Sequence, residues 1–92
     1  MRLVPYTSEL FEEDGCIVAI CPELNVSSYG ESASRALDAL KEAVELFLEE
    51  CLRMGTLDMV LEEAGYRREP GEEERWTYRQ PIQVNRLEAA VA

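Results

Sequence analysis

The sequence contains no histidine, which removes the usual general base near neutral pH and a leading zinc ligand. Cysteine is scarce too: the chain has three, Cys16, Cys21 and Cys51, with no CxxC spacing. Cys16 and Cys21 would point to opposite faces of one strand, so they cannot form a disulfide or share a metal ion. We interpret all three as small buried apolar residues. The chain is therefore expected to be no enzyme and to hold no metal or cofactor.

Long apolar runs and positive charge are also in short supply. No stretch approaches the roughly 18 residues of a membrane span, and the first residues do not resemble a signal peptide. We therefore expect a cytoplasmic protein with no membrane contact. Nine basic residues stand against nineteen acidic ones, a formal net charge of -10. Such a surface repels phosphate, so we predict that this chain does not bind DNA alone and that a basic protein is its natural complement.

What the chain does contain is the pattern of one small α+β domain over residues 1–92. The predicted architecture is an antiparallel three- to four-stranded sheet in the order β-β-β-α-α-β, with one long helix packed on one face. The expected elements are strands over residues 2–12, 16–21 and 26–30, a helix from residue 32 to about 54, and a short helix over 56–64. Asp14-Gly15 suits a hairpin turn between the first two strands.

The last part of the chain is harder to assign. Residues 1–66 form the predicted core, and the charged residues 67–75, with Pro70-Gly71, show no periodicity. We predict an exposed, mobile connection there. Residues 76–92 regain apolar character and are predicted to supply one more strand, in the later half, that returns to the sheet. Trp76 and Tyr78 could stack a base, but without basic neighbours packing is the favoured role.

The strand over residues 16–21 is apolar on both faces. Ile17, Ala19 and Cys21 alternate with Cys16, Val18 and Ile20. The long helix can cover one face, and 92 residues leave little material to cover the other. This predicts a homo-oligomer, a dimer or tetramer, with Val18 and Ile20 as candidate interface residues. The pattern does not decide which face meets the helix.

The first half of the chain resembles the HicB family of antitoxins. The resemblance covers residues 3–50 and lies in FEEDGCIVAICPELNVSSYGES followed by ALDALKEAVELFLEE. It implies a partial ribonuclease-H-like fold that oligomerises and inhibits a small basic HicA-type toxin, which cleaves messenger RNA. Many family members add a DNA-binding segment after this domain. Here only 26 residues follow Tyr66. Their first part is acidic and two prolines interrupt the segment, which departs from that pattern.

Exposed carboxylates are the candidate contacts to a basic toxin: Glu12, Glu13, Asp14 and Glu23. Clustered carboxylates also hold magnesium in ribonuclease-H-type enzymes. The cluster at 12–14 is better explained as a solvated turn, because adjacent turn residues diverge and no second set of carboxylates faces them. If the cluster did hold magnesium, the chain would be a nuclease, and it would cleave an RNA·DNA hybrid in a magnesium-dependent reaction. The alternative to an antitoxin is an orphan module of the same fold, structural or regulatory, without a toxin partner.

Overall fold

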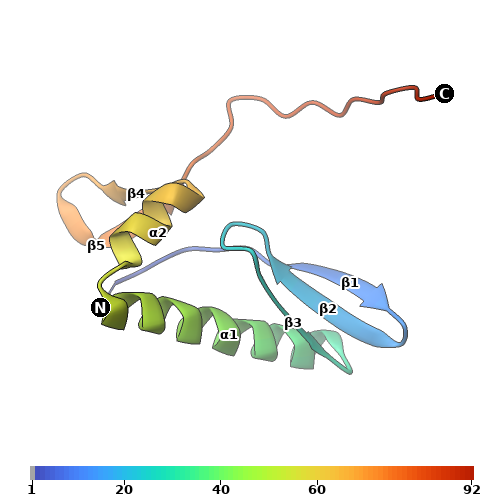
Figure 1. Ribbon diagram of the computed structural model, residues 1–92, viewed down its shortest axis with the longest axis horizontal. Helices are drawn as coiled ribbons and strands as arrows, with labels where there is room; N and C mark the ends of the chain where they lie inside the picture. The colour runs from blue at the N-terminus through green and yellow to red at the C-terminus, as the bar shows by residue number, and fades with distance from the viewer. Residues whose placement is uncertain (1) are drawn as a thin grey trace.

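The computed structural model describes residues 2–92, apart from the side chains of residues 72 and 73. It contains three strands, two helices and a final hairpin (Figure 1): β1 (Glu9–Glu13), β2 (Cys16–Cys21), β3 (Val26–Gly30), α1 (Ala33–Met54), α2 (Leu57–Ala64), β4 (Tyr66–Glu69) and β5 (Glu72–Tyr78). The α+β class, the antiparallel pairing and the long helix on one face of the sheet are confirmed.

The main sheet is an antiparallel meander in the order β1-β2-β3. Asp14 and Gly15 connect β1 to β2 with φ angles of 49° and 81°, as a two-residue hairpin turn of the favoured hand requires. The predicted first strand over residues 2–12 is too long, since β1 begins only at Glu9. Pro5 cannot donate to a strand ladder, and residues 4–8 run towards β1 without belonging to a strand.

The ends of helix α1 are set by two capping residues, Ser32 and Gly55. Ser32 Oγ accepts a hydrogen bond from Arg35 N at 3.2 Å, and Gly55 ends the helix with φ 74°. The helix packs on β2 and β3. Gly30 permits this approach, because a Cβ there would lie 2.6 Å from Ala36 N.

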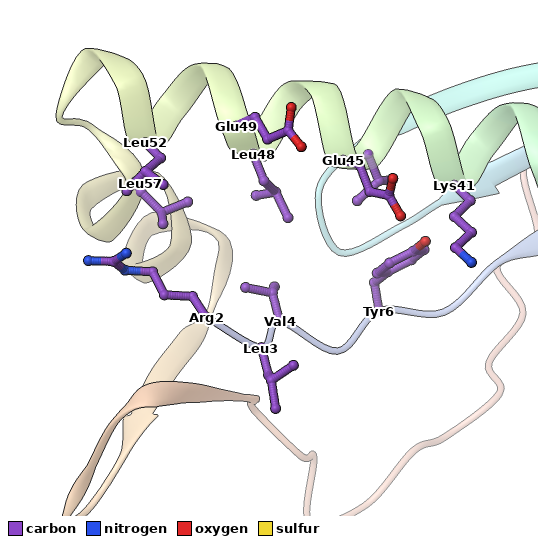
Figure 2. Close-up of a pocket in the computed structure, with 11 residues that line it drawn as sticks. Arg2, Leu3, Val4, Tyr6, Lys41, Glu45, Leu48, Glu49, Leu52 and Leu57 are labelled. Carbon is purple, nitrogen blue, oxygen red and sulfur yellow. The ribbon is translucent and has the colours of Figure 1, made fainter.

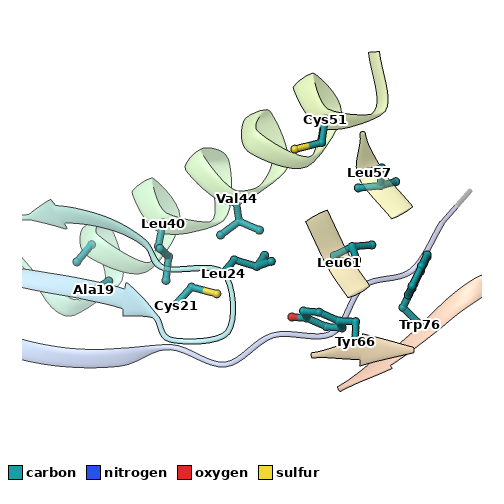
Figure 3. Packing of buried hydrophobic residues seen from close by; sticks show 11 residues of the cluster. Ala19, Cys21, Leu24, Leu40, Val44, Cys51, Leu57, Leu61, Tyr66 and Trp76 are labelled. Atoms are coloured by element: carbon teal, nitrogen blue, oxygen red, sulfur yellow. The ribbon is translucent and has the colours of Figure 1, made fainter. Parts of the chain in front are cut away.

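The hydrophobic core is one continuous cluster between these elements (Figure 3). Ala19 and Cys21 from β2 meet the buried stripe of α1, and α2 and the final hairpin extend the cluster towards the other end of α1. The largest fully buried side chains are Trp76, Leu40, Leu61, Val44 and Cys21.

Residues 67–75 do not form the irregular connection that the sequence suggested. They belong to the β4–β5 hairpin, whose turn is Pro70-Gly71, with Gly71 at φ 83°. Tyr66 and Tyr78 meet edge to face at 4.8 Å, and the Arg68 guanidinium lies 5.3 Å from the centre of the Trp76 ring. The prediction missed the hairpin because most of its residues are charged, and burial among its described side chains is nearly confined to a few aromatic positions.

The N-terminal segment joins the hairpin to the main sheet. Leu3 N donates to Glu74 O at 2.7 Å and Leu3 O accepts from Trp76 N at 3.0 Å, which makes a parallel bridge beside β5. Further along, Tyr66 Oη donates to Pro5 O at 2.7 Å. The last strand therefore pairs with β4 and with this segment, and the prediction that it returns to the main sheet is wrong.

The final residues extend away from the rest of the molecule (Figure 1). Arg79 N donates to Gly65 O at 3.1 Å, and residues 79–92 lie outside any helix or strand. The strand of the C-terminal segment lies in its first residues, up to Tyr78, and the prediction of a strand in the later half is wrong. Within residues 2–92, no helix is long and apolar enough to cross a membrane.

Candidate protein-binding surfaces

The tip of the β1–β2 hairpin is acidic and fully accessible. Glu12, Glu13 and Asp14 are all exposed, together with Glu9 at the start of β1. Glu12 pairs with Ile17 and Glu13 with Cys16, so the two carboxylates leave opposite faces of the sheet. In the part of the chain that the structure describes, no group of three or more His, Cys, Asp or Glu side chains is placed to hold a metal ion. The tip presents negative charge in several directions.

Glu23 does not belong to this surface. It follows β2, whose far end carries the hairpin tip, so the two positions lie at opposite ends of the strand (Figure 1). Its carboxylate accepts hydrogen bonds from Thr7 Oγ1 at 2.6 Å and Thr7 N at 3.1 Å. Burial alone would raise the pKa of Glu23, but these hydrogen bonds to the charged form lower it overall. Glu23 therefore anchors the N-terminal segment.

The face of the main sheet turned away from α1 is apolar at its centre. We call it the open face; one cross-strand row on it contains Phe11, Val18 and Tyr29. Phe11 is 48% exposed and Tyr29 71% exposed, whereas Ala19 on the other face is fully buried. The structure thus decides what the alternating pattern left open. Val18 and Ile20, the predicted interface residues, lie on the open face.

The three cysteines divide between these environments. Cys21 and Cys51 are buried, as predicted, and Cys16 is half-buried on the open face. Burial raises the pKa of the Cys21 thiol, with a smaller contribution from the Glu23 carboxylate beside it. A thiol with a raised pKa is a poor nucleophile near neutral pH.

In the final hairpin, Arg68 and Trp76 contact each other. Trp76 is almost completely buried, so the predicted packing role is confirmed and its ring is not available to stack a base. Arg68 covers this ring and pairs with Asp58 of α2.

A groove that sequence reasoning missed runs between α1 and the N-terminal segment (Figure 2). We call it the α1 groove; it has a volume of about 580 Å³, and its apolar lining comes from both walls: Leu3, Val4, Val44, Leu48, Leu52 and Leu57. Charged side chains stand along its edges: Arg2, Lys41, Glu45 and Glu49. Leu52 was the available signal, since it widens the apolar stripe of α1 beyond the part that covers the sheet.

Comparison with protein-family models, with curated proteins and with solved structures finds no match for this chain.

Proposed function

We propose that this chain is a binding protein of the antitoxin type, which masks a small basic protein by direct contact. The observation that carries the proposal is the β1–β2 tip, where the end of β1 and a two-residue turn place Glu12, Glu13 and Asp14 in solvent. Because the hairpin already fixes the backbone that carries these side chains, a partner has to order the side chains but not the loop. The resemblance to HicB antitoxins suggests the class of partner, a basic toxin that cleaves messenger RNA, and this would place the complex in the cytoplasm.

The charge of the whole molecule supports the same choice of partner. A net charge of -10 attracts a basic protein over a distance and accelerates the encounter, and the tip then provides a local contact. Helix α1 packs on β2 and β3, so the edge strand β1 is left to approach a partner. Glu23 is excluded from the proposed contact because Thr7 occupies its carboxylate.

Self-association through the open face is part of the proposal. Phe11, Val18 and Tyr29 would meet the same residues of a second copy around a two-fold axis, as in most homodimers. Glu9 and Glu13 lie on this face outside the apolar row, because they pair with Ile20 and Cys16. A dimer of this kind leaves both hairpin tips accessible at its edges.

The test uses the small basic protein encoded by a reading frame next to the gene. Both proteins are purified, and their dissociation constant is measured by calorimetry at low and at moderate salt. The variant E12Q/E13Q/D14N removes the charge of the tip while keeping its shape, since Asn tolerates the positive φ of residue 14. Affinity should fall by about tenfold or more, with a weaker dependence on salt.

A matched control separates the tip from the overall charge. The variant E42Q/E62Q/E63Q removes three exposed carboxylates from the two helices. It should change the affinity by less than about threefold, because charges far from a contact are screened. An equal loss of affinity in both variants would mean that the tip contributes only through the overall charge of the protein. If no basic neighbour exists, or if the two proteins migrate separately at low salt, the chain is an orphan module instead.

A further inference from the structure

The C-terminal arm, defined as residues 80–92, holds the most exposed aliphatic side chains of the described structure. Ile82 is 106% exposed, Val84 82%, Leu87 86% and Val91 90%. Segments that remain free in water are usually polar, because they have no apolar surface to bury. Four large aliphatic residues in thirteen point to a binding segment whose surface lies on another chain.

We propose that this arm lies in the α1 groove of a second copy of the chain. The groove is open along its length and is lined by apolar side chains from both walls. Within it, Leu52 is 47% exposed and Leu48 is only half-buried, so the chain leaves part of its own lining uncovered. An extended apolar segment would cover these side chains and its own residues at the same time.

The charges of the arm and the groove match. The arm contains one cation and one anion, Arg86 and Glu88, so it adds no net repulsion between two chains of net charge -10. On the helix wall, Lys41, Glu45 and Glu49 follow one another at intervals of four residues, about 6 Å along the axis. Two residues of an extended chain span about 6.6 Å. Arg86 can therefore stand opposite Glu45 while Glu88 stands opposite Lys41.

The position of the arm favours a second copy over the arm's own groove. Arg79 is held to Gly65 at the end of α2, and Gln80 lies in a hollow with Pro5, Thr7 and Tyr78. The hollow is lined by Thr77 and Tyr78 of the final hairpin, whereas the α1 groove lies between α1 and the N-terminal segment (Figure 2). The arm would have to cross the N-terminal segment to enter its own groove. The inference concerns self-assembly only and does not depend on the proposed toxin partner.

Disulfide trapping between separately prepared full-length chains tests the contact. Val84→Cys and Leu52→Cys are introduced singly in a Cys16→Ser background, since Cys21 and Cys51 are buried. The two proteins are mixed, oxidised mildly and analysed by non-reducing electrophoresis and peptide mass spectrometry. We expect a 52–84 disulfide that joins two different chains. Leu46→Cys is the matched control, because Leu46 is 58% exposed on α1 and does not line the groove.

Three outcomes would overturn the inference. One is cross-linking of Val84→Cys to Leu46→Cys as readily as to Leu52→Cys, and another is the absence of any 52–84 disulfide. The third concerns a further variant that carries Val84→Cys and Leu52→Cys on the same chain: an internal disulfide at monomer mass would place the arm in its own groove.

Charge substitutions in the arm provide a second measurement by sedimentation. I82D/V84D should weaken self-association by about tenfold or more, because two apolar side chains on the face of the extended arm that carries Arg86 and Glu88 are replaced by carboxylates. Q83D/N85D adds the same charge at polar positions of the arm and should stay within about twofold of the unmodified chain. Equal behaviour of the two variants would contradict the proposed contact. The arm is outside the folded core, so neither variant should unfold the domain.

Discussion

Tyr66 connects parts of the chain that are far apart in sequence. Its hydroxyl donates to the carbonyl of Pro5, 61 positions earlier, and its ring packs against Tyr78. Burial, with a smaller contribution from Glu23, raises the pKa of Tyr66 well above its usual value of 10.0. The neutral phenol is therefore part of what holds the hairpin to the N-terminal segment.

Alkaline pH should weaken the fold through this residue. Because the pKa of Tyr66 is higher in the folded than in the unfolded chain, the unfolded chain loses its proton first as pH rises. The contribution of Tyr66 to the free energy of unfolding should be constant below about pH 9 and should decrease as pH rises through about 10 and above. Urea unfolding at a series of pH values measures this. Tyr66→Phe should cost about 1 kcal/mol at neutral pH and show a shallower alkaline decrease. If Tyr66→Phe leaves the alkaline decrease in the free energy of unfolding unchanged, other groups cause that decrease.

The structural role of Glu23 could not be predicted from the sequence around it. In the sequence it is one more carboxylate in a chain with nineteen acidic residues, and we predicted it as a partner contact. In the structure, Thr7 supplies two hydrogen bonds to it across 16 positions of the chain. The neighbouring residues Pro22 and Leu24 give no signal of this role, because the partner, Thr7, comes from a segment that we predicted to be a strand.

At the scale of the element, α1 was predictable over its whole length. Its apolar stripe recurs at helical spacing, and Ser32 and Gly55 mark its two ends. Both signals act within a few residues and need no knowledge of the fold. The β4–β5 hairpin was not predictable in this way. Its apolar residues are few. Trp76 is buried in the tertiary structure, where Leu3 pairs beside it, Arg68 covers its ring and the core cluster includes it.

The N-cap of α1 gives a prediction at this scale. Ser32→Ala removes the hydrogen bond to Arg35 N and should lower the free energy of unfolding by about 1 kcal/mol. Ser34→Ala is the matched control: it lies within the first turn, where Ala is a better helix former than Ser, and should be neutral or slightly stabilising. Thermal or urea unfolding of both variants checks the difference. Equal effects would mean that the Ser32 side chain does not cap the helix.

At the scale of the whole molecule, the two faces of β2 have different tasks. Ala19 faces α1 and is completely buried, and its neighbour Val18 lies on the open face between Phe11 and Tyr29. The two residues are adjacent in the sequence, but Ala19 belongs to the core of the domain and Val18 to its proposed interface. Substitution by the same charged residue should therefore produce two different failures.

Val18→Asp should reduce the mass of the assembly to half or less while the domain stays folded, because a carboxylate on the open face interrupts the contact between copies. Ala19→Asp should unfold the domain, since it places a charge without a partner in the core. Sedimentation equilibrium measures the mass, and circular dichroism measures the fold. A chain of monomer mass before any substitution, or an assembly unaffected by Val18→Asp, would remove the open face as an interface.

The sequence alone determined the α+β class, the three-stranded meander apart from the start of β1, and the position of α1, because alternation, turn residues and helix caps are local. Only the tertiary structure decided which face of β2 meets α1, where the N-terminal segment runs, and how the last residues pair. Those features depend on contacts between distant segments, such as Tyr66 with Pro5 and Leu3 with Trp76. The energy of such contacts comes from burial and from hydrogen bonds whose partners are brought together only when the chain has folded.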